Sequence, residues 1–363
     1  MFKLAWEEIR YQPKKYILIE ILIVIMLFMV LFLTGLSNGL GREVSAQIDN
    51  YGDMTYILKD DAKGNITYSN MTEKDKSNLS DLSLKKLAGL TIQRASVTKA
   101  GKGDKKDISY FAIEKSSLLN PKISQGKILS TDKKEVVLDE SFKQEGIKIG
   151  DKIKDSASEI TLTVVGFTKE AKYGHSSIGF ISKDTYVAMR EANQPNYKWL
   201  PQAYVTSSKP SNSSLPSGLK AYQKQAIIEK ISGYQAEHLT LTMITWVLLL
   251  ASAAILGVFF YILTLQKLHQ FGVLKAIGFS MTKIAISQIL QIMILATIGI
   301  GIGVVAAIGL ARVMPVGMPF FLEYSRIAIV VLSFIAITVT CGALSLLKVR
   351  QVDPVQVIGG NGE

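Results

Sequence analysis

Apolar residues are concentrated in four long blocks of the chain. The first block runs from Ile17 to Leu36 and is interrupted only by Glu20. About 20 helical residues are needed to cross a hydrocarbon core ~30 Å thick, so this block predicts a transmembrane helix over 17–40. Three similar blocks predict transmembrane helices over 241–265, 284–310 and 327–347.

The first block also has features of a signal peptide. Basic residues precede it, and Val44-Ser45-Ala46 loosely fits a cleavage site after it. The apolar region of a signal peptide is about 7–15 residues long, which is shorter than this block. We therefore interpret the block as a helix that stays in the protein.

Polar and small residues occur at a few positions within the predicted helices. Glu20 lies about one turn inside the first helix, where it either makes a buried polar contact or reaches the interface near Lys14. Gly35 and Gly39 form a G-x-x-x-G pattern, and glycines recur over Gly299–Gly303. Small residues let transmembrane backbones approach closely, so both patterns predict helix packing, within the chain or in a dimer.

The distribution of charge indicates a membrane protein. The chain of 363 residues has 41 Lys+Arg and 30 Asp+Glu, and in a soluble protein this excess would suggest nucleic acid as a partner. Here 30 of the basic and 24 of the acidic residues lie in 41–240, between the first two predicted helices. We therefore expect a lipid bilayer, and no nucleic acid, around this chain.

Basic residues in the short flanks predict the orientation. Arg312 and Arg326 bracket one short loop, whereas nine basic residues lie on the other side: Lys3, Arg10, Lys14, Lys15, Lys267, Lys275, Lys283, Lys348 and Arg350. Short cytoplasmic loops are enriched in Lys and Arg, and long loops are exempt from the rule. Both termini are therefore predicted in the cytoplasm of a multi-pass cell-membrane protein, with 41–240 outside.

These observations predict nine segments along the chain. They are a cytoplasmic amphipathic helix at 1–16, transmembrane helices at 17–40, 241–265, 284–310 and 327–347, an extracytoplasmic α+β domain at 41–240, a cytoplasmic coupling segment at 266–283, a short outer loop at 311–326 and a cytoplasmic tail at 348–363. In the first segment, Phe2, Ala5, Trp6 and Ile9 have the spacing of one helix face, which suits a helix on the membrane surface. Pro13 is expected to end it.

The large inserted segment mixes strand and helix signals. Runs rich in β-branched and aromatic residues predict strands at 53–58, 108–113, 134–138, 160–167, 176–181 and 202–206. Residues 139–145, 183–191 and 222–232 look helical instead, and the last of these leads toward the second span. The expected fold is therefore a membrane α-helical protein with four spans and an α+β domain between the first two.

Motifs for chemistry within the chain are missing from the sequence. No G-x-x-x-x-G-K-[ST] run is present, so the chain cannot hold nucleotide in a P-loop. Cys341 is the single cysteine, which rules out an internal disulfide. His175, His238 and His269 are expected far apart, and no hydrolase motif accompanies them. We therefore expect no enzyme, no catalytic residue, no permanently bound cofactor and no metal site apart from a haem iron.

The cytoplasmic segments resemble those of a known transporter family. Gly272–Gly278 is similar to the "GxLKAIG" run that follows the second span in permeases of the FtsX/MacB superfamily of ABC transporters, and Arg350–Ile358 is similar to the ending of that family. Glu135–Asp151 and Thr163–Gly166 resemble its external core domain. Together these stretches cover most of the chain in the family's order.

The resemblance implies a partner for the coupling segment. Its apolar positions can pack into a groove on a cytosolic protein, although a plain interfacial helix would show the same pattern. In the family this partner is a separate ABC ATPase subunit, expected in two copies, with the permease itself a homodimer. The implied ATPase-coupling residues are Leu268, Phe271, Leu274, Lys275 and Ile277.

Within the superfamily, Ala5–Arg10 and Leu33–Leu40 look most like the HrtB-type permeases, which expel haem from the membrane. This resemblance implies haem as the substrate. Tyr, His and Met are axial ligand types for haem iron, and a carboxylate could also reach the iron. The substrate-binding candidates are Tyr234, Glu237, His238, Met243, Tyr51 and Met54. Tyr173 and His175 are less favoured candidates. Tyr and His also serve as interfacial anchors.

Two other functions fit the same architecture. A mechanotransmission permease would couple ATP hydrolysis to a wall hydrolase or to lipoprotein release without moving a substrate. A peptide or antibiotic exporter would keep the mechanism and change the cargo. The candidate haem ligands favour the haem pump, because a force transmitter has no need of them.

Overall fold

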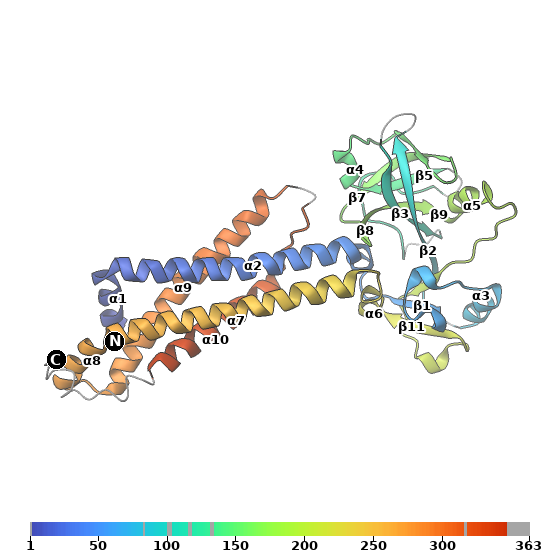
Figure 1. The fold of residues 1–363 in the computed structure, drawn as a ribbon. Coiled ribbons are helices and arrows are strands. Elements are labelled where there is room, and N and C mark those ends of the chain that lie inside the picture. Colours follow the sequence, from blue (N-terminus) through green and yellow to red (C-terminus); the bar gives the residue numbers. More distant parts are fainter. Residues whose placement is uncertain are drawn as a thin grey trace. The chain divides into compact units, whose positions relative to one another are not determined.

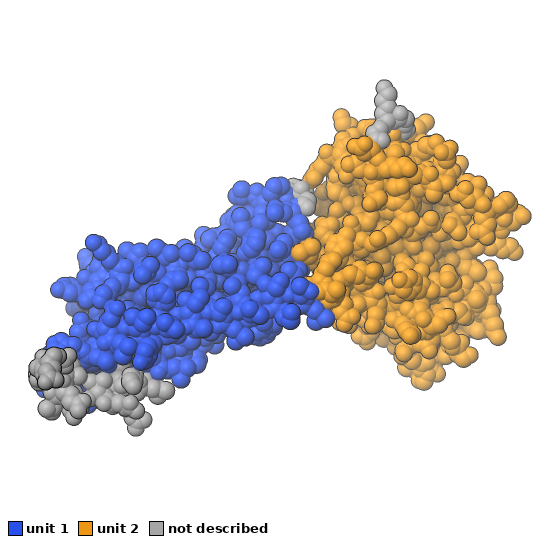
Figure 2. All heavy atoms as spheres, in the orientation of Figure 1, with its two compact units in different colours: residues 1–39, 239–363 blue, residues 40–238 orange. Residues whose placement is uncertain are grey.

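The computed structural model describes residues 2–82, 84–99, 104–114, 118–130, 134–315 and 318–346, so the predicted tail at 348–363 lies outside the described residues. The chain divides into two compact units (Figure 2). We call residues 1–39 and 239–363 the membrane unit and residues 40–238 the inserted unit. Each is described separately below.

Among the described residues, four helices are long and apolar enough to cross a membrane, and Figure 1 labels them. They are α2 (Pro13–Asn50), α7 (Tyr234–Gln266), α9 (Met281–Val313) and α10 (Tyr324–Leu346). Two shorter helices of the membrane unit are α1 (Phe2–Tyr11) and α8 (Leu268–Ala276). The four predicted spans are thus confirmed, although α2 and α7 extend well beyond the predicted apolar blocks.

The core of the membrane unit is built from all four long helices. Its buried side chains include Ile23 of α2, Leu256 of α7, Leu295 of α9 and Phe334 of α10. Gly299 and Gly303 lie on the α9 surface that faces α2, where added methyl groups would meet Ile23 and Leu27. The glycine pattern of the third span therefore allows close packing between two helices of the same chain.

The G-x-x-x-G pattern at the end of the first span has another role. A Cβ atom at Gly39 would collide with the backbone of Pro319, and one at Gly35 would meet the ring of Phe320. The Phe321 amide also donates a hydrogen bond of 2.9 Å to the Gly35 carbonyl oxygen. Within the chain the two glycines therefore receive the 318–322 loop and not a second helix, and their packing in a dimer stays a prediction.

The inserted unit contains one mixed sheet of eleven strands among its described residues. The strands are β1 (Thr55–Lys59), β2 (Ala88–Lys99), β3 (Lys106–Ile113), β4 (Ile123–Gly126), β5 (Glu135–Asp139), β6 (Lys152–Asp155), β7 (Thr161–Thr168), β8 (Lys172–Tyr173), β9 (Ser176–Ser182), β10 (Ala203–Thr206) and β11 (Leu219–Gln223). The main path is β11-β1-β10-β2-β3-β9-β5-β7-β4, in which β3 pairs with β9 and β5 with β7 in parallel. β6 bridges β2 and β7, and β8 pairs with β9.

Alternation of side chains along the central strands builds a core on each face of the sheet, as the period of two requires. Phe111 and Phe180 point to one core, which the end of α2 joins through Val44 and Ile48. Tyr110 and the neighbouring even positions of β3, Ile108 and Ala112, belong to the second core. The helices of this unit are α3 (Glu73–Ser80), α4 (Ser141–Gln144), α5 (Lys183–Glu191) and α6 (Lys224–Ile228). The predicted α+β class is confirmed.

The approach to α7 differs from the sequence expectation. A continuous helix over 222–232 was expected, but Tyr222 belongs to β11 and only α6 is helical in this stretch. Gly233 has φ of +90°, in the left-handed region that ends one element and starts another. α7 therefore begins abruptly at Tyr234, and this start places its first turn in the inserted unit.

Candidate functional site

The first turn of α7 gathers polar and aromatic side chains within the inserted unit. The rings of Tyr234 and His238, one helical turn apart, stack at a centroid distance of 5.6 Å with 13° between their planes. Glu237 lies between them in sequence, and its Oε1 is 2.9 Å from Nε2 of His175. We call Tyr234, Glu237, His238 and His175 the histidine cluster.

His175 reaches this position because of the tight turn between β8 and β9. Gly174 and His175 both have positive φ, at +56° and +62°, which reverses the chain over two residues. Their amides donate to the carbonyl oxygens of Val44 and Glu43, at 2.9 and 3.1 Å, near the end of α2. The turn is therefore fixed by backbone hydrogen bonds, which aim the imidazole at α7.

The two carboxylate oxygens of Glu237 differ in their hydrogen-bond partners. Its Oε1 contacts His175, whereas Oε2 is buried and has no hydrogen-bond partner among the described residues. The side chains of both residues remain partly exposed, at 38% for Glu237 and 41% for His175. A buried oxygen without a partner costs free energy, so this carboxylate is poised to accept a donor or a cation.

Three of the substrate-binding candidates lie outside the histidine cluster. Tyr51 is buried in the core of the inserted unit, where its hydroxyl donates to the Leu119 carbonyl oxygen at 3.3 Å, and burial raises the pKa of the phenol. Met54 packs against the same core. Met243 is 66% exposed on α7, six residues beyond Glu237 and, by helical geometry, on another face.

The expected separation of the histidines is therefore wrong for one pair. His175 contacts Glu237, the residue before His238, although the two histidines are distant in sequence. Tyr173, the other less favoured candidate, is buried beside Phe111 and belongs to the core. Over the described residues, no group of three His, Cys, Asp or Glu side chains has the arrangement of a metal site.

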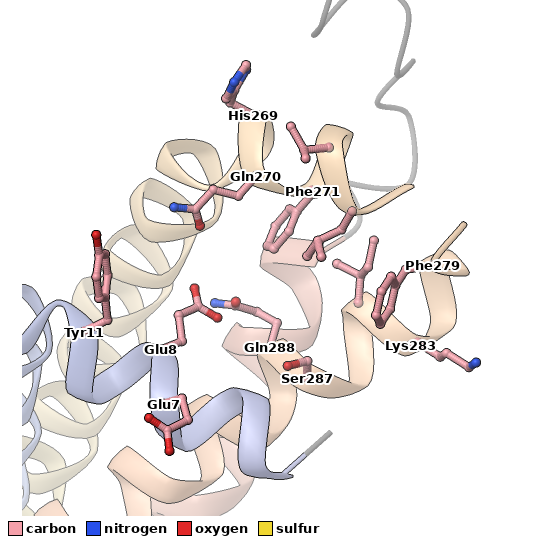
Figure 3. A pocket seen from close by; sticks show the side chains of 13 residues that line it. Glu7, Glu8, Tyr11, His269, Gln270, Phe271, Phe279, Lys283, Ser287 and Gln288 are labelled. Carbon is pink, nitrogen blue, oxygen red and sulfur yellow. The ribbon is translucent and has the colours of Figure 1, made fainter. Parts of the chain in front are cut away.

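A second candidate site is a groove in the membrane unit (Figure 3). It has a volume of about 560 Å³ and is bounded by α1, α8 and the start of α9, and we call it the α1–α8 groove. In Figure 3, Glu8 and Gln288 point toward each other across the groove, whereas His269 and Lys283 point away from it. Its apolar wall includes Phe271, Val273, Leu274, Phe279 and Ile284.

The five coupling candidates divide into inward and outward positions. Phe271 is 6% exposed and packs on Ile284, and Leu268 and Leu274 pack against this pair. Ile277 is 71% exposed at the end of the segment. Lys275 is partly exposed in the last turn of α8. The inward residues therefore hold α8 on α9, and Ile277 is the apolar candidate that is free to contact a partner.

Sequence reasoning missed a polar network beside this groove, of which Glu8 and Gln288 line the groove itself. The network joins α1, the α7–α8 junction and α9. It consists of the buried Lys267, Gln288 and Gln291 and the partly exposed Glu8. Their signal was present, because a lysine and two glutamines adjoin apolar spans, where polar side chains need partners. Which of them pair could not be read from a single sequence.

Fold and sites together define a class of protein. Four membrane-spanning helices, a mixed α/β domain inserted between the first two, and a short helical segment between the second and third are the architecture of a transporter permease.

Comparison with known proteins identifies the family. The model of the MacB-like periplasmic core domain matches residues 18–214, and that of the FtsX-like permease C-terminal region matches residues 242–354. The chain belongs to the MacB/FtsX family of ABC transporter permeases.

Relatives of nearly full length give a finer comparison. The chain is 27% identical to a protein named as the HrtB permease of a hemin transport system in Staphylococcus haemolyticus, over 98% of this chain and 99% of that protein. It is 28% identical to a protein of the same name in Staphylococcus epidermidis, with the same coverage. The periplasmic region of MacB from Actinobacillus actinomycetemcomitans aligns with 50% of this chain and 94% of its own length at 15% identity, with a TM-score of 0.36 that is too low to support an argument.

Proposed function

We propose that this chain is the permease subunit of an ABC efflux pump that expels haem from the membrane. A separate ATPase subunit, in two copies, would supply the energy to a permease homodimer. The family membership and the hemin-transport names of the near-full-length relatives support this proposal. Its cargo would be a flat, apolar molecule with anionic propionates that partitions into lipid.

The observation that carries the haem proposal is the histidine cluster. Histidine and tyrosine are axial ligand types for haem iron, and stacked aromatic rings offer a flat apolar surface. The free oxygen of Glu237 adds an acceptor beside them. His175 and His238 thus join the cluster from two segments, which is the form expected of a site and not of isolated interfacial anchors.

The proposed orientation rests on charge. Nine basic residues flank the spans on the side of both termini, and Arg312 and Arg326 lie on the other. With the termini in the cytoplasm, the inserted unit is extracytoplasmic and the α1–α8 groove faces the cytosol. In this arrangement the ATPase subunit would contact the exposed end of the coupling segment around Ile277.

Haem titration of the purified full-length permease tests the cargo. The expected result is a saturable shift of the haem absorbance band, with affinity about tenfold lower when His175, Glu237 and His238 are all replaced by Ala, because the ligand set and its acceptor are lost together. His269→Ala is the matched control, since this histidine lies in the membrane unit.

Two outcomes would contradict the proposal. Equal haem affinity in the triple variant and in the control would place the site elsewhere. Absence of saturable binding by the unaltered protein would remove haem as cargo and leave the mechanotransmission alternative, in which ATP hydrolysis acts on an extracytoplasmic event.

A further inference from the structure

The break between α7 and α8 is built around a buried lysine. Lys267 is the single residue between the two helices, with φ of −96° and ψ of −1°. Its amide donates to the Thr264 carbonyl oxygen at 3.2 Å, and its carbonyl oxygen accepts from the Phe271 amide at 2.9 Å. The chain therefore turns at Lys267 without losing backbone hydrogen bonds, and the side chain, 8% exposed, points inward.

The ammonium group of Lys267 meets polar groups from two other helices. Its Nζ lies 2.6 Å from Glu8 Oε1 of α1, 2.6 Å from Gln291 Oε1 and 3.1 Å from Gln288 Oε1, both of α9. The Gln291 amide contacts the second oxygen of Glu8. The ring of Tyr16 at the start of α2 lies 5.4 Å from Nζ. Residues of three helices, α1, α2 and α9, thus converge on one side chain.

Stability alone does not account for this arrangement. Burial lowers the pKa of Lys267, Glu8 offsets part of that effect, and Lys15 adds to it. A buried ion pair is often no more stabilising than apolar side chains of similar volume, and its better-attested use is to fix one geometry. The geometry fixed here is that of α1 against the α7–α8 junction.

The position of the pair suggests what this geometry serves. Glu8 and Gln288 line the α1–α8 groove, and α1 and α8 both contact α9. Phe271 of α8 packs on Ile284, whereas Val273 and, just after the helix, Ile277 are exposed on another face. A push on that face would reach α1 through the Lys267–Glu8 pair.

We propose that the Lys267–Glu8 ion pair clamps the N-terminal helix to the coupling segment, so that the two move as one body when a partner subunit presses on α8. Lys267 is then a positioning residue that contacts neither substrate nor nucleotide. This inference rests on the proposed ATPase-driven function for its consequence, but the clamp itself is a property of the permease alone.

The clamp is tested by a distance measurement on the full-length permease without a partner. Spin labels on Glu7→Cys and Val273→Cys, in a Cys341→Ala background, report the separation of α1 and α8. The unaltered pair should give a narrow distance distribution. Glu8→Leu with Lys267→Met, which replaces the pair by apolar side chains, should broaden it while the protein stays folded.

Two further variants complete the design. Glu8→Lys with Lys267→Glu restores an ion pair and should narrow the distribution again. Asp53→Leu with Lys209→Met makes the same change at an exposed pair of the inserted unit and should leave the distance distribution narrow. An equally narrow distribution in the apolar variant overturns the clamp. If that variant fails to fold, Glu8→Gln with the same labels takes its place, and a narrow distribution there overturns the proposal.

The consequence for transport is measured with the partner ATPase in liposomes. The apolar variant should retain ATPase binding but move about tenfold less haem per ATP hydrolysed, within the range that residues away from both sites contribute to coupling. An unchanged ratio would show that the clamp has no part in transmission. If the unaltered permease neither binds an ATPase nor moves haem, the proposed function fails, and the distance measurement still decides the clamp.

Discussion

Gly39 and Gly301 both lie on membrane-spanning helices but differ in what a methyl group would meet. At Gly39 it would collide with the Pro319 backbone, whereas at Gly301 it would meet nothing within 4 Å. We expect Gly39→Ala to lower the stability of the protein by about 1–3 kcal/mol, the usual cost of overpacking. Thermal unfolding in detergent micelles measures this.

Gly301→Ala is the control for the change of residue type. Alanine favours a helix over glycine by about 1 kcal/mol in water, so this variant should unfold at the same temperature as the unaltered protein or higher. If Gly39→Ala and Gly301→Ala unfold at equal temperatures, the 318–322 loop does not depend on the glycine surface.

Ile277 and Phe271 belong to one short segment, but replacing each by Asp should have a different effect on ATPase binding and on stability. Ile277→Asp should reduce co-purification of the ATPase about tenfold, since it removes an exposed apolar contact from the expected interface, and leave thermal unfolding unchanged. Phe271→Asp should lower the unfolding temperature, because its side chain is buried against Ile284.

Ile128→Asp supplies the control, because this exposed isoleucine lies in the inserted unit. Ile128→Asp should change neither the co-purification of the ATPase nor the unfolding temperature. Full ATPase recovery with Ile277→Asp would exclude this residue from the interface, and the segment would then be a plain interfacial helix.

At the scale of elements, α3 owes its start to a capping box. Thr72 accepts from the Asp75 amide at 3.2 Å, and the Asp75 carboxylate accepts from the Thr72 amide at 2.8 Å and pairs with Lys59. Burial alone would raise the pKa of Asp75, but the hydrogen bonds from Lys59 and Thr72 lower it below 3.8. The unfolded chain therefore takes up this proton at a higher pH than the folded chain.

The pH dependence follows from that difference. The stabilisation is complete above pH 3.8 and is lost as the pH falls through the lower folded-state pKa. Asp75→Asn should therefore unfold at a lower temperature than the unaltered protein at pH 7, and the gap should close in acid. Thermal unfolding of both proteins across pH 7 to about 3 measures the gap; a constant gap would contradict the assigned role.

The helices were easier to predict than the sheet. Span length and apolar composition are properties of one contiguous segment, so the four spans and α5 were located from sequence. β2 was missed because its second half, Gln93–Lys99, mixes polar and apolar residues without turn signals. β11 is absent from the sequence prediction, in which its last two residues belong to a helix, and its pairing with β1 is set by residues distant in sequence.

The candidate sites were predicted in part for the same reason. Tyr234, Glu237 and His238 are near neighbours on α7, so the sequence alone places them together, whereas only the β8–β9 turn brings His175 to Glu237. No sequence signal indicates that Tyr51 is buried, because its burial depends on the packing of the sheet core. The Lys267–Glu8 pair joins two residues far apart in sequence, which no local pattern can reveal.

At the scale of the whole molecule, two helices carry the chain from one unit to the other. α2 continues unbroken past residue 39 and α7 begins before residue 239, so each helix contributes to both units. Val44 and Ile48 of α2 are core residues of the inserted unit, and Ile23 and Leu27 are core residues of the membrane unit.

The most direct test of this account is transport by the reconstituted complex. The permease and its ATPase partner are placed in liposomes loaded with haem, and ATP-dependent transfer of haem to apomyoglobin on the side of the inserted unit is followed by absorbance. We predict transfer that requires ATP and, at haem concentrations below saturation, is about tenfold slower in the His175, Glu237 and His238 triple alanine variant. Sustained ATP hydrolysis without any transfer of haem would contradict the proposed pump.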